Sequence, residues 1–346
     1  MKKTLVALAA LAVVGAASAQ STVSITGKVG AAYQSVDSAT GVASRGMNLT
    51  NADFKLAAME DLGGGLRAMA SVSYETPVTG AVGAGTFSQG VVRRDTSLAL
   101  MGQFGLLSFN NTRSSNWLTK AFVAPAELQH GIYDLGAMGI VNRSPVDVLT
   151  FQTKSMSGVQ GLVQWTDTGT DGTATPAVNV LTLGGTYAQG PLAAGLQYKM
   201  HYFTDAYKAT AQAFGGIGRK TRLEAFATYD LGMAKVGVGF DGGNVGTVDN
   251  ALAPAALGGG SQAMVDFNKS SAYSLGVSAP VGAMTVGANW AKRENSNMFE
   301  TVVKYDLSKR TYVNTSWGRQ SQDALNGAAG AITTGHQYRV GLYHTF

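Results

Sequence analysis

The sequence predicts an all-β protein, a closed transmembrane barrel of sixteen antiparallel strands. Two patterns carry this prediction: segments with alternating apolar and polar residues recur along the chain, and short turns alternate with longer connections between them. The third observation is composition, because glycine reaches 45 of 346 residues, proline only 7, and charged residues 14%. Beyond the first segment of the chain, no apolar run is long enough for a membrane-spanning helix.

The first segment is typical of export. A basic start, "MKK", precedes an apolar stretch over residues 4–17, and the small residues of "GAASAQS" resemble a cleavage site. The apolar stretch is shorter than the roughly 20 residues that a spanning helix needs. We therefore expect a signal peptide over residues 1–20, cleaved after Ala19 or Gln20, and one barrel over residues 21–346.

Composition excludes several kinds of chemistry. The chain has no cysteine, so disulfides, thiolate catalysis and cysteine-bound metals are ruled out. Without the expected signal peptide, 24 basic and 21 acidic side chains leave a formal charge of +3, which by itself neither favours nor excludes nucleic acid. The four histidines lack partners at metal-binding spacing. We expect no metal, no cofactor and no nucleic-acid partner.

Alternation is clearest near the two ends and in the middle of the mature chain. In "TVSITGKVGAAYQ" (22–34) and "PLAAGLQYKMHY" (191–202), apolar residues fall on one face and mostly small or polar residues on the other. "VQGLVQWT" and "MTVGANW" repeat the pattern, with Trp165 and Trp290 near one end. These segments are expected to be half-buried strands.

Each short turn joins two successive strands into a hairpin. They occur at residues 60–66, 102–107, 155–160, 188–192, 229–235, 279–284 and 305–310. Longer Gly-, Ser-, Thr- and Asn-rich stretches lie between them, including 76–92, 113–145, 204–217, 244–268 and 320–333. Seven hairpins with one strand at each terminus give sixteen strands. Short connections on one side and long ones on the other are typical of outer-membrane barrels, with periplasmic turns and extracellular loops.

The last segment, "GHQYRVGLYHTF", alternates up to Phe346. A lipid-facing strand has no water for its backbone, so only a closed barrel leaves no unpaired edge. We expect this strand to pair with the first one and Phe346 to lie in the aromatic girdle at the periplasmic interface. The expected lipid-facing residues are Tyr338, Val340, Leu342, His344 and Phe346, and the expected inward residues are Gln337, Arg339, Tyr343 and Thr345.

Several phrases of the sequence resemble one known family. "STVSITGKV", "EDLGGGLRA", "RDTSLALMGQFGLLSFNN" and "RVGLYHTF" are similar to Gram-negative trimeric porins of the betaproteobacterial type, over the whole mature length. The resemblance implies a homotrimeric channel in the cell outer membrane, surrounded by its lipid, for small hydrophilic solutes and ions. It implies that the third extracellular loop, here roughly residues 113–145, folds into the lumen. It also implies that the barrel-assembly machinery reads Phe346.

The resemblance further implies a constriction with arginines on one wall. Arg93 and Arg94, just before "DTSLAL", match one basic position, and Arg143 matches the strand that leaves the third loop. The usual "GRQ" is replaced by "NNTR", which leaves Arg113 as a loose substitute. The basic residue that usually precedes "EDLGGGL" is absent, and its place falls near Asp53.

Charged side chains that line a water-filled lumen set electrostatic barriers, and basic ones favour anions. In the third loop, Glu127 and Asp134 are expected to face the pore. Basic residues on the polar faces of strands are expected to add to a positive wall: Lys28, Lys199, Arg222, Lys304 and Arg339. The sequence thus predicts a general diffusion channel with a weak preference for anions.

Two other functions remain as alternatives, a substrate-specific outer-membrane channel and an outer-membrane barrel enzyme. An aromatic track formed by Trp117, Phe122 and Tyr133 would favour the specific channel. The outward positions offer no nucleophile with a base, so we expect no enzyme and no catalytic residue. "GVGFDG" (237–242) fits a dinucleotide motif, but it lies in an alternating strand with no helix after it.

Overall fold

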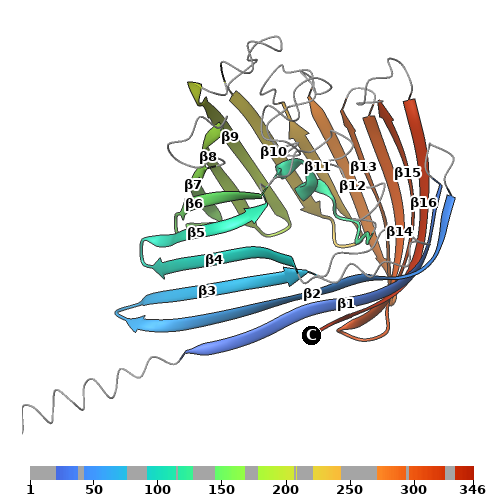
Figure 1. Ribbon diagram of the computed structural model, residues 1–346, viewed down its shortest axis with the longest axis horizontal. Coiled ribbons are helices and arrows are strands. Elements are labelled where there is room, and N and C mark those ends of the chain that lie inside the picture. Colours follow the sequence, from blue (N-terminus) through green and yellow to red (C-terminus); the bar gives the residue numbers. More distant parts are fainter. Residues whose placement is uncertain are drawn as a thin grey trace, which may run out of the picture.

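The computed structural model describes residues 21–37, 43–75, 92–113, 116–127, 145–167, 178–205, 208, 221–242, 271–293, 296–323 and 332–346. These residues form a closed barrel in which each strand pairs antiparallel with its sequence neighbours and the last strand pairs with the first (Figure 1). The predicted fold, a barrel of sixteen antiparallel strands, is confirmed. The expected signal peptide lies outside the described residues.

The strands are β1 (Thr22–Asp37), β2 (Ala43–Gly63), β3 (Leu66–Glu75), β4 (Val92–Gly102), β5 (Gly105–Arg113), β6 (Pro145–Gln152), β7 (Val159–Asp167), β8 (Val178–Gln189), β9 (Leu192–Phe203), β10 (Thr221–Asp230), β11 (Lys235–Asp241), β12 (Ala272–Val281), β13 (Met284–Arg293), β14 (Ser296–Asp306), β15 (Thr311–Asp323) and β16 (Ile332–Thr345). A short 3-10 helix, η1 (Trp117–Ala121), lies between β5 and β6 in sequence. No helix among the described residues is long and apolar enough to cross a membrane.

Side chains alternate between the inner and outer faces of the barrel, as the two-residue period predicts. On β1, Tyr33 is 48% exposed while its neighbour Gln34 is 3% exposed. On β16, Leu342 is 52% exposed and Arg339 only 1%. This reverses the pattern of a soluble protein, because the exposed face is apolar and the buried face is polar. Such an arrangement suits lipid outside and a polar lumen inside.

The seven short turns are where the sequence places them, and all lie at one end of the strands. The turn between β2 and β3 needs glycine, because Gly63, Gly64 and Gly65 have φ angles of 83°, 61° and 80°. At the other end, the connection between β13 and β14 spans only residues 294–295. Connections on that side are therefore not all long, although most are.

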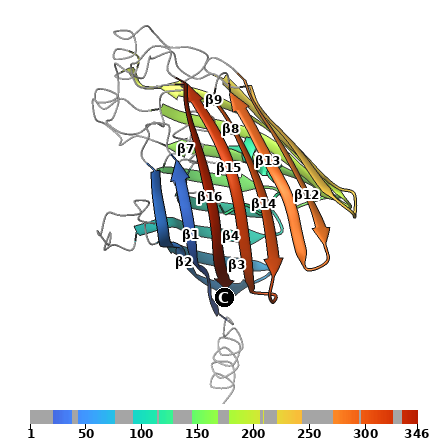
Figure 2. The ribbon, with the colours of Figure 1, turned by 90° about the vertical axis from the view of Figure 1, so that its right-hand side faces the viewer.

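β1 and β16 close the barrel along a continuous register from Lys28 opposite Thr345 to Asp37 opposite His336. Figure 2 shows the two strands side by side, with the C-terminus at the turn end of the barrel. Phe346 extends the seam by one pair, since its N–H and its C=O each bond to Gly27 at 3.0 Å. The Phe346 ring occupies the space where a Cβ on residue 27 would stand. The predicted pairing of the last strand with the first is confirmed.

Candidate functional site

The segment formed by residues 116–127 lies inside the barrel. Asn116 caps η1 by accepting a hydrogen bond from the N–H of Leu118 at 2.8 Å. The helix packs against β10, β11 and β12, none of which is a neighbour of β5 in the sheet (Figure 1). Trp117, Leu118 and Ala121 are buried. The described part of the third loop, residues 116–127, is therefore folded inward, as the family resemblance implied.

Glycines on the inner wall allow this close approach. A Cβ at Gly237 or Gly276 would overlap the carbonyl oxygen of Ala121, and one at Gly287 would come within 2.7 Å of the Ala124 Cβ. A residue with a side chain at any of these positions would push the segment away from the wall. The repeated glycines of "VGVGF" thus form a seat for the loop, which explains the motif better than a dinucleotide site does.

One carboxylate fastens the beginning of the segment to β9 and β10. Glu224 Oε2 accepts hydrogen bonds from the backbone N–H of Trp117 at 2.9 Å and from Gln197 Nε2 at 2.6 Å. Its Oε1 lies 2.7 Å from Lys199 Nζ and 3.2 Å from Arg222 Nε. The Glu224 side chain is fully buried, so these partners offset the cost of removing its charge from water.

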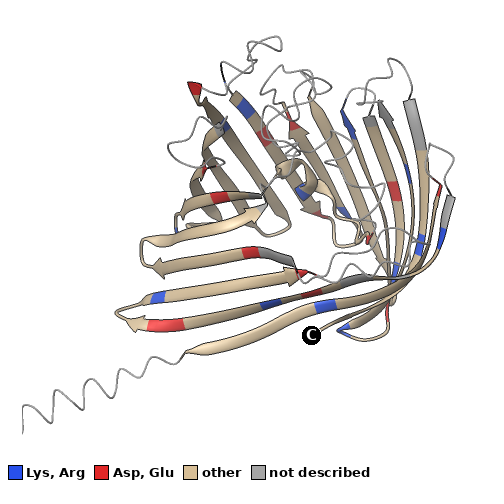
Figure 3. Ribbon diagram, viewed as in Figure 1, with Lys and Arg blue, Asp and Glu red and all other residues tan. Residues whose placement is uncertain are grey.

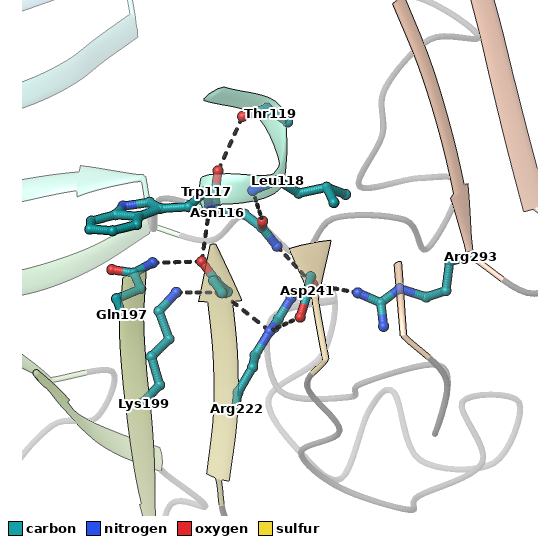
Figure 4. A network of polar contacts seen from close by, with 10 residues as sticks. Asn116, Trp117, Leu118, Thr119, Gln197, Lys199, Arg222, Asp241 and Arg293 are labelled. Atoms are coloured by element: carbon teal, nitrogen blue, oxygen red, sulfur yellow. Dashed lines mark hydrogen bonds and ion pairs between the residues drawn. The ribbon is translucent and has the colours of Figure 1, made fainter. Parts of the chain in front are cut away.

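A second carboxylate, Asp241, completes this anchor. It accepts a hydrogen bond from Asn116 Nδ2 at 3.0 Å and from Arg222 Nε at 2.7 Å, and it forms ion pairs with Arg222 and Arg293 (Figure 4). Charge-assisted bonds of this kind are stronger than neutral ones. Because Arg222 contacts both Asp241 and Glu224, the two carboxylates form one network. We call it the η1 anchor: Asn116, Trp117, Gln197, Lys199, Arg222, Glu224, Asp241 and Arg293.

Amides hold the middle of the segment. Asn289 on β13 accepts from the N–H of Ala124 and donates to its C=O, both at 3.2 Å, and it also donates to Glu300 at 2.7 Å. Asn314 on β15 donates to the C=O of Pro125 at 2.8 Å. The barrel wall therefore satisfies the backbone groups of Ala124 and Pro125, as a buried irregular segment requires.

Glu127 fastens the end of the segment to the strands of the seam. Lys28 Nζ on β1 donates to Glu127 Oε2 at 2.8 Å, and the Tyr312 hydroxyl on β15 donates to Oε1 at 2.6 Å. Arg339 on β16 donates to the backbone carbonyl of Glu127. We call these four residues the seam clasp. It holds the loop against three strands that include both sides of the barrel closure.

Lys120 projects from η1 over aromatic rings. Its Nζ lies 4.4 Å from the centroid of the Trp117 ring and 5.0 Å from that of Phe226. Burial lowers the pKa of the Lys120 ammonium group, and the nearby negative charge of Glu224 opposes this shift. The cation therefore sits in a partly desolvated aromatic setting, where cation–π attraction is strengthened.

Carboxylates gather on the inner wall opposite the η1 anchor, on β2 to β4. Asp53 lies opposite Lys28 in the β1–β2 register and opposite Glu75 in the β2–β3 register. Asp95 on β4 accepts a hydrogen bond from the Thr112 hydroxyl at 2.7 Å. Basic and acidic residues thus both occur around the barrel (Figure 3).

The basic residues expected on polar faces lie on the inner face of the barrel, and most of them contact the inserted segment or its anchors. Lys304 reaches only the side of the seam clasp, because its Nζ lies 4.6 Å from the centroid of the Tyr312 ring and 2.7 Å from Asp306. Lys28, Lys199 and Arg222 pair with the carboxylates that hold the loop, and Arg339 donates to the loop backbone, so these four support the loop. Their role in the charge of the lumen stays a prediction. The set is Lys28, Lys199, Arg222, Lys304 and Arg339.

The remaining expected site residues are described less fully. Arg93 and Arg94 lie in β4, and Arg113 is the last residue of β5. The structure describes the backbone of these three residues but not their side chains. Asp134 and Arg143 lie outside the described residues. Their pore-lining roles stay predictions.

Sequence reasoning missed three of the five charged residues of the η1 anchor, namely Glu224, Asp241 and Arg293. A signal was present, because Arg222 and Glu224 are two residues apart and therefore share a face, as do Arg293 and Asn289. Alternation assigns a face but not a partner on another strand. The pairing of these charges became visible only with the register of β9 to β13.

Comparison with known proteins gives a consistent result. Residues 4–325 match the family described as Gram-negative porin. An outer membrane porin protein of Bordetella pertussis is 28% identical, with both chains covered completely.

Solved structures share the fold. An anion-selective porin from Comamonas acidovorans superposes with a TM-score of 0.65 at 21% identity, covering 94% of this chain and 100% of the other. A loop-deletion mutant of OmpT, an outer membrane protein of Vibrio cholerae, gives 0.60 at 12% identity over 94% and 99%. A mutant porin of Rhodopseudomonas blastica gives 0.58 at 14% identity over 94% and 100%.

Proposed function

The chain belongs to the Gram-negative porin family and resides in the outer membrane, and from this premise we propose that it is a general diffusion channel for small hydrophilic solutes and ions, with a weak preference for anions. The observation that carries the proposal is the 116–127 segment, which lies along the inner wall of the barrel from β10 to β16 and is fixed at both ends by the η1 anchor and the seam clasp. A segment that is fixed in place reduces the width of the channel but does not move to close it. Solute size and lumen charge then govern passage.

The preference for anions rests on charge. Arg93, Arg94, Arg113 and Arg143 are proposed to add positive charge near the constriction, while Asp53 and Asp134 oppose them. The anion-selective porin of Comamonas acidovorans, with the same fold, supports the sign of the proposal. A planar-bilayer measurement of reversal potential across a salt gradient tests it directly.

The proposal includes biogenesis and assembly. Residues 1–20 act as the export signal, the mature barrel forms a homotrimer, and the barrel-assembly machinery recognises the last strand with Phe346. The resemblance to trimeric porins supports the oligomer, and the family points to a channel rather than an enzyme.

Selectivity should respond to single charges at the constriction. We expect modest anion preference at low salt that fades near molar salt, because the Debye length is about 10 Å at 0.1 M and about 3 Å at 1 M. Arg143→Gln should weaken the preference, and Asp53→Arg should strengthen it, which reversal potentials measure. A wild-type channel that prefers cations at low salt would contradict the charge assignment but leave the channel function standing.

Removing Phe346 should reduce assembly. The deletion loses two hydrogen bonds to Gly27 and the ring at the turn end of the seam, while the export segment is unchanged. We expect less heat-modifiable trimer in the outer membrane and normal passage across the inner membrane. Phe346→Tyr, which keeps an aromatic ring and the backbone pair, serves as the control. Equal trimer yields for the deletion and for the wild type would refute the role in assembly.

A further inference from the structure

Lys120 differs from the basic residues that support the inserted segment, because no carboxylate is paired with it. Lys28, Lys199 and Arg222 each lie within 3.2 Å of a carboxylate oxygen that holds the loop. Within the part of the chain that the structure describes, Lys120 forms no ion pair. Its side chain is exposed inside the barrel. Lys120 therefore presents a positive charge to the lumen without a bound counter-charge.

Aromatic rings, rather than a carboxylate, hold the Lys120 ammonium group in place. The rings of Trp117 and Phe226 both lie within 5.0 Å of its Nζ, measured to the ring centroids. The two rings meet edge to face, with centroids 5.5 Å apart and an interplanar angle of 83°. An aromatic ring attracts a cation through its quadrupole and carries no net charge. The ammonium group is thus positioned by the rings and keeps its charge and its N–H donors for another partner.

The barrel wall fixes both rings. The backbone N–H of Trp117 donates to Glu224 at 2.9 Å, and Phe226 on β10 lies opposite Gly195 on β9. A Cβ at Gly195 would come within 2.7 Å of the Trp117 ring and 2.6 Å of the Phe226 ring, so glycine leaves the space that the two rings occupy. A site that is already in its binding geometry loses less entropy when a ligand binds. The support of Lys120 is therefore pre-formed.

Apolar surface adjoins the Lys120 ammonium group. The sequence "AFVAPA", residues 121–126, has no charged or hydrogen-bonding side chain. Phe122 and Val123 are half-buried, as is Phe226, so part of each side chain remains accessible inside the barrel. Burial among these groups lowers the pKa of Lys120, because the ammonium group has lost part of its water. A few polar groups on mostly apolar surface are typical of sites for small organic ligands.

We propose that Lys120, Trp117, Phe226 and Phe122, here called the Lys120 site, bind small organic anions that have an apolar body, such as aromatic monocarboxylates. The carboxylate accepts hydrogen bonds from the Lys120 ammonium group, and the apolar body covers the accessible part of the Phe226 ring. Anions without an apolar body gain only the contact with the charge. The proposal rests on the proposed channel function, because the solute reaches Lys120 through the lumen, and it adds a preference among anions.

The test uses the full-length barrel with benzoate as the probe and acetate as the comparison, since acetate has the carboxylate without the ring. In planar bilayers, the measured quantity is the concentration that halves the chloride current. In detergent, calorimetry measures binding to the purified barrel, which does not depend on conduction.

Three variants and one control separate the contributions to binding. Lys120→Gln removes the charge, Lys120→Arg keeps a cation that can stack on the rings, and Phe226→Leu removes one ring. The matched control is Lys55→Gln, which removes the same charge from an exposed lysine on β2. Lys55 lies opposite Thr26 on β1, and among the described residues no ring contacts its ammonium group.

We expect benzoate to bind the wild type and to halve its chloride current at a much lower concentration than acetate does. Lys120→Gln should raise this concentration and the dissociation constant about tenfold or more, because a hydrogen bond to a charged group is lost. Phe226→Leu should raise both about threefold, as the loss of one ring contact predicts. Lys120→Arg and Lys55→Gln should stay close to the wild type.

Several results would overturn the Lys120 site. Equal binding of benzoate and acetate would mean that charge alone acts, and an equal loss in Lys55→Gln would assign the effect to the net charge of the lumen. Unchanged binding in Lys120→Gln would place benzoate elsewhere. A wild type that conducts ions but binds no benzoate refutes this site and leaves the channel function standing. A wild type that binds benzoate through Lys120 in detergent but forms no conducting channel refutes the proposed function instead.

Discussion

A barrel that lacks residues 118–138 should conduct more than the wild type and still insert into membranes. The deletion removes η1 after Trp117 and the stretch up to Glu127, which lies along the inner wall from β10 to β16. None of the sixteen strands is shortened, so the hydrogen-bonded ring that satisfies the backbone in lipid stays intact. We expect single-channel conductance to rise about twofold or more, because the deletion removes the segment that we propose narrows the pore.

A second variant distinguishes the effect of the segment's presence in the lumen from the effect of its charge. Glu127→Gln keeps the segment in the lumen but removes the ion pair with Lys28, which is 2.8 Å long. Its conductance should lie close to that of the wild type, with more current noise because one end of the segment is held less firmly. If the deletion and the wild type conduct equally, the constriction is formed elsewhere and the loop assignment is wrong.

The barrel could be predicted because its determinants are local. Alternation in β1, β9 and β16 fixes which side chains face lipid, and turns such as "EDLGGGL" fix where strands reverse. The pairing of β1 with β16 followed from the requirement that no strand edge remain open in lipid. These arguments need no knowledge of distant contacts.

The loop supports could not be predicted in the same way. Lys28 and Glu127 are separated by 99 residues, and Arg339 and Glu127 by 212. A period of two residues says that Lys28 and Arg339 face inward, but the height of each residue in the lumen depends on the stagger of all the strands. The path of the third loop decides which of these residues it meets. Sequence reasoning therefore expected these basic residues to line a positive wall, and the structure shows Lys28 and Arg339 supporting the loop.

Asp241 was not among the predicted site residues, and its contacts also depend on residues far away in the sequence. Its own neighbourhood, "GVGFDG", suggests a glycine motif rather than a charged site. Its partners Asn116 and Arg293 come from the third loop and from β13, which are 125 and 52 residues away. Only the closed barrel brings these groups together.

The largest expected loss of stability follows from Asp241→Asn. The substitution keeps the size of the side chain but removes the negative charge that faces Arg222 and Arg293, and both Asp241 and Arg293 are at most 1% exposed. Breaking a buried ion pair by neutralising one partner costs about 3–5 kcal/mol, because the remaining cation stays out of water without its counter-charge. The midpoint of heat unfolding should fall accordingly.

The same substitution should also loosen the third loop, since Asn116 would lose its carboxylate acceptor at the start of η1. We expect larger current fluctuations in single channels and faster proteolysis within the loop, both in barrels that still insert. Asp230→Asn is the matched control: this carboxylate ends the same hairpin at the turn, is exposed, and accepts from the N–H of Gly232 at 2.8 Å. Its effect should stay within about 1 kcal/mol, as for most surface changes. Similar unfolding midpoints for the two variants would mean that water in the lumen replaces the ion pairs, and that the glycine seat and the amide contacts hold the loop without the η1 anchor.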